Sequence, residues 1–281
     1  MLRSALLLIL FSYTSVFALD VTNATSSTIT QGDVLFIPIK DDCTKVKLTI
    51  SKLGTYQVMR FENKKLLIVP IDLRKATGTY EVPRCSVYDT ASELKTFSII
   101  ERYKDTRNFS IPKSEGGNTT KNAHKVKKEI QNDAKIFWNI RSYDMQLWEK
   151  PFIYPLPVST ITDTFGYIRD SQGVEVAHKG IDFKASTGEK VHAMNKGIVK
   201  YVGTLPSYGK TIVVDHGKGI LTVYLHLSKI LVSKGSIVRQ GQVIGTTGDT
   251  GFVTGPHLHV SIHVNGISID PLSFMKGVGK K

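Results

Sequence analysis

Short runs of β-branched and aromatic residues recur through the first hundred positions, and turn-forming residues separate them. The runs lie at residues 34–37, 46–50, 56–58, 66–69 and 97–100. Glycine and aspartate fall between them, as at Gly32, Asp41 and Gly54. Short strands joined by turns at this spacing are typical of a β-sandwich. We therefore predict a small sandwich-like domain over residues 19–103.

The hydrophobic pattern changes to a helical period after the turn-rich stretch at residues 114–118. Apolar side chains then recur at steps of four, four and three, at Val126, Ile130, Ala134 and Phe137. This spacing places them on one face of a helix. Thr119 or Thr120 has the side chain needed to cap its start. We predict that residues 104–150 are a linker with a helix that packs on a neighbouring domain.

Residues 151–281 return to strands, with glycine between them. This part holds 18 of the 23 glycines of the chain. Strand-like runs lie at residues 197–203, 211–215 and 221–226. A helical interpretation fails, because glycine is costly in helix interiors. We predict a mainly β protein in which this part forms a compact antiparallel β barrel or sandwich-like domain.

The first eighteen residues have the pattern of a secretory signal peptide. Arg3 precedes an apolar run at residues 5–11, and Ala18 suits a cleavage site. An uncleaved membrane anchor is the alternative, but the run is shorter than the roughly 20 residues that a span needs. We predict cleavage after Ala18 and a periplasmic or secreted protein. In an oxidising compartment we expect Cys43 and Cys85 to form a disulfide, with two buried thiols as the alternative.

The chain is strongly basic, with a formal net charge of +13 and a pI near 9.6. For an exported protein, this charge favours association with a polyanionic cell wall or a membrane surface, and not with nucleic acid. A basic surface that only keeps the protein in solution is the alternative. The sequence does not specify an oligomeric state.

Three segments carry residues that suit metal chemistry. His178 and Asp182 are four positions apart with a glycine between them, so a loop can bend both towards one point. Imidazole nitrogen and carboxylate oxygen are normal zinc ligands. His257 and His259 point to the same face of a predicted strand, about 6.6 Å apart along the chain. His226 ends an apolar strand, where a lone core histidine is the usual interpretation.

In order and spacing, these segments resemble those of lysostaphin-type, or LytM-type, zinc peptidases of metallopeptidase family twenty-three. The segments are HKGID at 178–182, YLHL at 224–227 and GPHLH at 255–259, within a similar glycine-rich framework. The resemblance covers residues 151 to 272 and implies a fold of the duplicated hybrid motif type. It also implies one zinc ion per chain. The implied ligands are His178, Asp182 and His259, and the implied catalytic residues are His226 and His257.

The resemblance further implies the reaction, which is hydrolysis of cross-links or stem peptides of bacterial peptidoglycan. Three protein ligands leave a fourth position for a water molecule, whose pKa zinc lowers to about 7. We therefore expect a zinc-activated water to be the nucleophile. We assign His257 as the general base and His226 as the hydrogen-bond donor to the oxyanion, although these two roles can be exchanged. The alternatives are a non-hydrolytic regulator of another wall hydrolase and a peptidase that acts on proteins.

Overall fold

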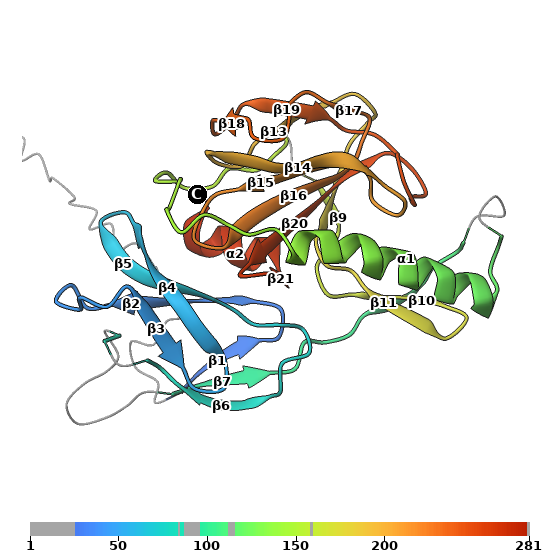
Figure 1. Ribbon diagram of the computed structural model, residues 1–281. Helices are drawn as coiled ribbons and strands as arrows, with labels where there is room; N and C mark the ends of the chain where they lie inside the picture. Colours follow the sequence, from blue (N-terminus) through green and yellow to red (C-terminus); the bar gives the residue numbers. More distant parts are fainter. Residues whose placement is uncertain (1–25, 84, 87–95, 112–115, 158–159, 280–281) are drawn as a thin grey trace, which may run out of the picture.

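The computed structural model describes residues 26–83, 85–86, 96–111, 116–157 and 160–279 (Figure 1). The predicted signal peptide at residues 1–18 lies outside the described residues. Within the described ranges, neither helix is long and apolar enough to cross a membrane. Strands make up most of the regular structure, which confirms the prediction of a mainly β protein.

Two small sheets form the N-terminal part. Their strands are β1 Ser26–Thr30, β2 Val34–Ile39, β3 Lys47–Ile50, β4 Gly54–Phe61, β5 Lys64–Pro70, β6 Gly78–Glu81 and β7 Thr96–Ile100. One sheet has the order β2-β5-β4-β3, and the other has the order β1-β7-β6 with β1 parallel to β7. Side chains from both sheets, among them Ile37, Leu67 and Phe97, share one buried cluster. The sandwich-like arrangement predicted for this part is therefore present.

Cys43 and Cys85 are neighbours in this part, but they remain two thiols. A hydrogen bond between the two side chains raises the pKa of Cys85. No covalent bond joins the sulfurs. The predicted disulfide is therefore absent from the structure. The two sulfurs are close enough for a hydrogen bond but too far apart for a covalent S–S bond.

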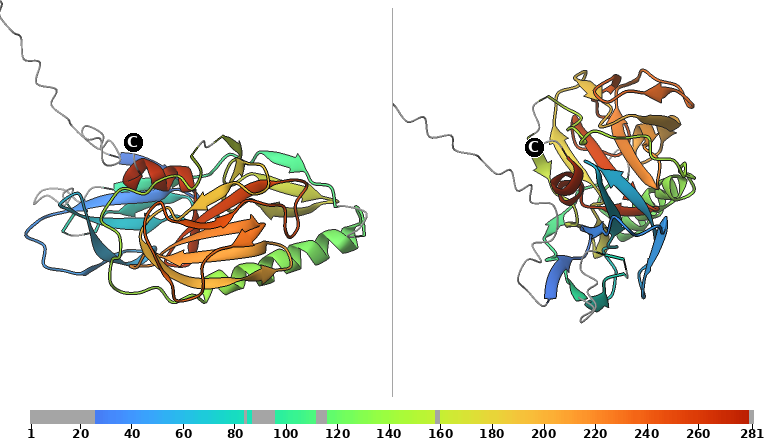
Figure 2. Two further views of the ribbon diagram at one scale, coloured as in Figure 1. Left: turned by 90° about the horizontal axis from the view of Figure 1, so that it is seen from above. Right: turned by 90° about the vertical axis from the view of Figure 1, so that its left-hand side faces the viewer.

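The predicted helix is present as α1, Thr120–Trp138. Thr119 caps its start, because its side-chain oxygen accepts a hydrogen bond from the backbone N–H of Asn122 (3.2 Å). The apolar residues buried on its inner face are Ala123, Val126 and Phe137. Oδ2 of the buried Asp133 accepts a hydrogen bond from the backbone N–H of Ser207 (2.7 Å), which fastens the helix to the C-terminal part. Figure 2 shows α1 running along the side of that part.

The C-terminal part contains the largest sheet. The remaining elements are β8 Thr106–Asn108, β9 Ile161–Asp163, β10 Ile168–Ser171, β11 Val174–Ala177, β12 Ile181–Lys184, β13 Lys190–His192, β14 Gly197–Leu205, β15 Gly209–Asp215, β16 Ile220–Leu227, β17 Lys229–Ile230, β18 Ile237–Val238, β19 Val243–Thr246, β20 His257–Val264, β21 Ile267–Ile269 and helix α2 Pro271–Val278. The large sheet has the order β18-β14-β15-β16-β20-β12-β9, and β21 pairs with β20. Two smaller sheets have the orders β13-β19-β17 and β11-β10-β8.

The large sheet and the β13-β19-β17 sheet pack face to face. Val191 and Ile244 of the smaller sheet share a buried cluster with Ile212 and Tyr224 of the larger one. The outer strands of the large sheet, β18 and β9, do not pair with each other. Of the two predicted arrangements, the described residues therefore form the sandwich-like one and not a closed barrel.

One hydrophobic core extends across the N-terminal and C-terminal parts. The ring centroid of Phe61 on β4 lies 5.4 Å from that of Trp148. Phe152 lies 5.3 Å from Trp148 and 5.0 Å from Phe274 on α2. These aromatic contacts bury surface between the two parts, so each part contributes to the stability of the other. The boundaries predicted at residues 103 and 150 remain a prediction.

Candidate metal centre and active site

Two adjacent strands and one loop bring three of the predicted site residues together. Asp182 of β12 lies directly opposite His259 of β20 in the antiparallel register. His178 belongs to the loop between β11 and β12. This loop can approach β20 because Gly180 has no side chain: a Cβ atom there would lie 2.3 Å from Nε2 of His259. The glycine between His178 and Asp182 is therefore a packing requirement of the site.

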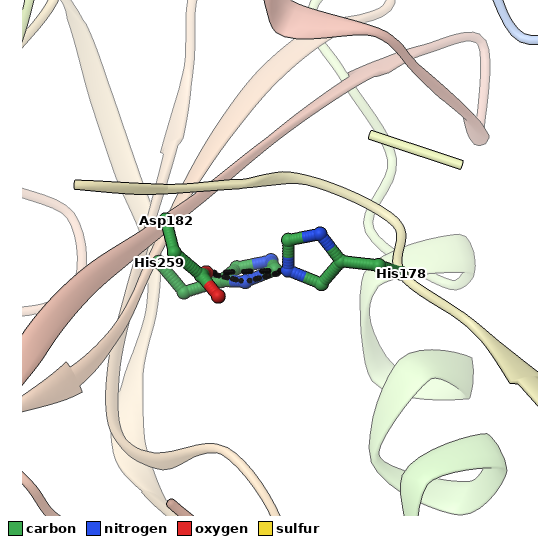
Figure 3. Close-up of side chains that lie close together, drawn as sticks. All are labelled: His178, Asp182 and His259. Carbon is green, nitrogen blue, oxygen red and sulfur yellow. Dashed lines mark hydrogen bonds and ion pairs between the residues drawn. The ribbon is translucent and has the colours of Figure 1, made fainter. Parts of the chain in front are cut away.

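Three potential ligand atoms converge in the interior of the protein (Figure 3). Nε2 of His178 lies 3.2 Å from Oδ1 of Asp182 and 3.1 Å from Nδ1 of His259. The Oδ1 atom of Asp182 and the Nδ1 atom of His259 are 2.7 Å apart. Tetrahedral ligands at zinc–ligand distances of about 2.0–2.1 Å lie about 3.3 Å from one another. The three atoms are therefore arranged as they would be around one small ion.

The hydrogen bonds behind the two imidazole rings direct their lone pairs inwards. Nδ1–H of His178 donates to the backbone oxygen of Thr164 (2.8 Å), so Nε2 carries the lone pair. Ser261 donates its hydroxyl proton to the backbone oxygen of Lys179 (2.8 Å) and accepts from Nε2–H of His259 (2.9 Å). Nδ1 of His259 therefore also carries a lone pair. Such outer hydrogen bonds are what orients metal-ligating histidines.

The charges of the three residues suit a bound cation. Burial alone would raise the pKa of Asp182, but His259 and His178 hold it well below its usual range. Nη2 of Arg169 lies 3.3 Å from Oδ2 of Asp182, which leaves Oδ1 directed at the histidines. Burial lowers the pKa of His259 to about 4. At neutral pH Asp182 is therefore a carboxylate and His259 offers a lone pair, and both are in the deprotonated form that metal binding needs.

His226 and His257 lie beside this cluster, on the adjacent strands β16 and β20. Their ring centroids are 4.9 Å apart, and the His226 ring is 6.2 Å from that of His259. Nδ1–H of His226 donates to the backbone oxygen of Thr250 (2.8 Å), and Nδ1–H of His257 donates to that of Gly255 (2.9 Å). The Nε2 atom of each ring therefore carries a lone pair. Nε2 of His257 lies 3.9 Å from Oδ1 of Asp182, so the structure brings all five predicted site residues together.

His226 is held in an unusual backbone conformation. Its φ is +61°, which is uncommon for a residue other than glycine. The backbone N–H of His226 donates to the backbone oxygen of Tyr208 (3.0 Å), which helps to hold this conformation. Burial lowers the pKa of the side chain to about 3, so the ring is neutral at pH 7. Strained residues that the surrounding structure maintains are frequent at functional sites.

A cavity of ≈ 390 Å³ opens beside the cluster. His178, His226 and His259 line one side of it, and the inner face of α1 lines the other through residues such as Val126 and Phe137. Among the described residues, no side chain from 26–150 forms a hydrogen bond or an ion pair with any of the five site residues. Helix α1 therefore borders the space next to the site, but its described side chains form no hydrogen bond or ion pair with the candidate ligands.

Four residues that orient the site were not identified from the sequence. Thr164, Arg169 and Thr250 lie 14, 13 and 24 positions along the chain from the site residues that they contact, and no local pattern marks them. Ser261 had a usable signal, because it lies two positions after His259 and therefore on the same face of a strand. All four act on site residues through the hydrogen bonds and the ion pair described above.

Replacing the close-packed glycine should disturb the cluster. In Gly180→Ala, the new Cβ atom would lie 2.3 Å from Nε2 of His259 and 2.5 Å from the backbone oxygen of Val260. Both distances are shorter than real contacts allow, so the loop carrying His178 must move away from β20. We expect metal affinity to fall by about 10–100-fold, the range typical of disturbed outer contacts. Titration with zinc against a chelator would measure it. Gly255→Ala is the control, because a Cβ atom there meets nothing within 4 Å, and equal loss in both variants would contradict the steric argument.

The sequence and the fold both match known peptidases. Residues 176–271 match the sequence model of the family described as Peptidase family M23. A segment of 122 residues, 43% of this chain, is 38% identical to the DD-carboxypeptidase/endopeptidase Mpg of Neisseria meningitidis and covers 28% of that protein. A segment of 95 residues, 34% of this chain, is 44% identical to the peptidoglycan DD-endopeptidase ShyA of Vibrio cholerae and covers 22% of that protein. The matched segments thus span about a quarter of each relative.

A solved structure shares the fold over most of the chain. The crystal structure of a putative peptidase M23 from Pseudomonas aeruginosa superposes with a TM-score of 0.60 at 24% identity. The similarity covers 88% of this chain and 95% of that chain, so it extends to the N-terminal part as well. At this level of identity it shows a common fold. The chain carries a domain of peptidase family M23, as its histidine and aspartate motifs predicted.

Proposed function

We propose that this protein is a zinc-dependent endopeptidase that hydrolyses peptide cross-links or stem peptides of bacterial peptidoglycan. The observation that carries the proposal is the convergence of Nε2 of His178, Oδ1 of Asp182 and Nδ1 of His259 within 3.2 Å of one another. Two relatives named as endopeptidases support the choice of reaction, and the region that matches peptidase family M23, residues 176–271, contains these three residues.

In this proposal, His178, Asp182 and His259 hold one zinc ion. Two imidazole nitrogens and one carboxylate oxygen form a ligand set that is common for catalytic zinc. When bound there, zinc supplies a Lewis acid that polarises the scissile carbonyl and makes water more acidic. Arg169 keeps the carboxylate of Asp182 in place through its second oxygen.

His257 and His226 carry out the proton chemistry. Nε2 of His257 has a lone pair and lies 3.9 Å from Oδ1 of Asp182, so it can accept the proton of the attacking water and pass it to the leaving amine. The other histidine, His226, acts on the oxyanion that develops on the scissile carbonyl. In the structure its Nδ1–H is donated to Thr250, so to donate to the oxyanion the neutral ring would take the tautomer that carries the proton on Nε2.

We further propose that the protein acts outside the cytoplasm. The signal-peptide pattern of residues 1–18 and the cell-wall substrates named for the relatives support this location. The basic charge of the chain would favour contact with the polyanionic wall or a membrane surface.

Digestion of purified peptidoglycan tests the proposed reaction. The mature, zinc-loaded protein should release soluble peptide-bearing fragments, and mass spectrometry of these fragments identifies the bond that is cut. A chelator should stop the release, and added zinc should restore it. If the protein binds zinc but releases nothing, while it stimulates a second wall hydrolase in the same assay, it is a regulator and the proposed hydrolysis is wrong.

A further inference from the structure

The cavity beside the site has a strongly positive lining. Its charged residues are five cations and one anion, namely Arg74, Lys127, Lys135, Arg169, Lys179 and Glu175. This ratio exceeds that of the whole chain, which has 37 basic and 24 acidic residues. The cavity therefore concentrates positive charge next to the cluster of histidines, and a low-dielectric cleft strengthens its field.

Acidic partners neutralise only the two arginines. Arg74 pairs with Asp72 (3.1 Å), and Arg169 pairs with Asp182 (3.3 Å). Among the described residues, no carboxylate lies within 4.0 Å of the three lysine ammonium groups of the lining. Asp72, the partner of Arg74, also acts on Lys179 through its charge but forms no ion pair with it, so the cavity offers cationic groups to a further anion.

Lys179 is the lysine that is best placed to meet a substrate. It directly follows His178, and its backbone oxygen accepts hydrogen bonds from the hydroxyls of Ser261 (2.8 Å) and Ser268 (3.0 Å). Its main chain is therefore fixed relative to the metal cluster. Its ammonium nitrogen lies 5.9 Å from the ring centroid of Trp138, the last residue of α1, which is 48% exposed. The charge is therefore held at the rim of the cavity, between the loop and the helix.

We infer that Lys179 binds a free carboxylate of the substrate close to the scissile bond, so that the site selects anionic peptides. This inference rests on the proposed function, and it narrows the substrate class. A substrate carboxylate that meets this exposed ammonium group forms a charge-assisted hydrogen bond with it. The same excess of positive charge repels cationic peptides, which adds selectivity by repulsion. Trp138 and the inner face of α1 would cover the bound peptide on the other side.

A pair of matched peptides tests this selection in the zinc-loaded, full mature chain. The two peptides differ only in whether a group next to the scissile bond is a carboxylate or a carboxamide. We expect the ratio of their kcat/KM values to favour the carboxylate by about threefold, as for one ion pair at an exposed lysine. Lys179→Met should bring this ratio close to one, and Lys179→Arg should restore most of it. Lys234→Met removes an exposed lysine outside the cavity and should leave the ratio unchanged. The wild-type preference should also weaken with added salt.

Binding of non-hydrolysable analogues of the same two peptides, measured by calorimetry, separates this inference from the proposed function. In one outcome, neither peptide is hydrolysed, but the wild type binds the carboxylate analogue more tightly and Lys179→Met does not. The proposed hydrolysis is then wrong, and the carboxylate site stands. If both peptides are hydrolysed with a ratio that Lys179→Met leaves unchanged, the carboxylate site is wrong and the function stands. If there is neither hydrolysis nor a difference in binding, both are wrong.

Discussion

His178→Ala and Asp182→Ala should each abolish zinc binding. The wild-type chain should retain about one zinc ion per chain after dialysis, as expected for a catalytic site with three protein ligands. Each substitution removes one of three converging atoms, and the two that remain cannot complete the site. Removal of Asp182 also removes the one negative charge among the ligands and leaves Arg169 without its carboxylate partner. Zinc content by atomic absorption measures the loss directly.

Two controls distinguish loss of a ligand from loss of the fold. His263→Ala removes another buried histidine of β20, four positions after His259, that has no part in the cluster, and it should retain zinc. Added zinc should raise the unfolding temperature of the wild type, because a ligand that binds the native state stabilises it. The same addition should leave the unfolding temperatures of His178→Ala and Asp182→Ala unchanged. Normal zinc content in both variants would show that these residues are not the ligands.

The pKa values of the ligands set the expected pH range of this binding. Protons compete with zinc for the same lone pairs. Burial lowers the pKa of His259 to about 4, and the neighbouring histidines hold that of Asp182 well below its usual range. Both groups are therefore deprotonated at neutral pH, and their protonation weakens zinc binding only in acid, as the pH falls towards the pKa of His259.

The periodic elements of the fold were predictable from the sequence because each depends on a local pattern. The steps of four, four and three that end at Phe137 became α1, and Thr119 became its cap. The alternation through His257 and His259 became β20. Long-range packing had no such pattern. The contact of Phe61 with Trp148 joins residues far apart in the chain, so the core shared by the two parts was visible only in the structure.

For the site, as for the fold, the features that depend on local spacing were predictable from the sequence. The short spacings within residues 178–182 and 257–259 indicated convergence, and the strand register places Asp182 opposite His259 as that convergence requires. The backbone of His226, with its φ of +61°, could not be foreseen, because the fold imposes that conformation on an ordinary strand-like sequence. Arg169 was equally hidden, since its pairing with Asp182 depends on how β10 lies beside β12 in space.

His257→Ala should separate zinc binding from catalysis. The side chain of His257 lies outside the group of three ligand atoms, so we expect the variant to keep about one zinc ion per chain. Its Nε2 lone pair is directed towards the cluster, 3.9 Å from Oδ1 of Asp182, and it is the group proposed to move the proton. Removal of a general base lowers kcat by about 10²–10⁴-fold. Turnover of a soluble peptide substrate, together with the zinc content of the same sample, measures both properties at once.

The matched variant His226→Ala tests the division of roles between the two histidines. It should also keep zinc, because the His226 ring lies 6.2 Å from that of His259 and outside the group of ligand atoms. If His257 is the general base, a small exogenous base such as imidazole should restore part of the activity of His257→Ala, since it can enter the cavity of ≈ 390 Å³ and accept the proton. It should restore less in His226→Ala, where the lost group stabilises a developing charge and a mobile base does not reproduce its fixed position. The opposite pattern of rescue would exchange the two roles, and wild-type turnover in His257→Ala would exclude that residue from proton transfer altogether.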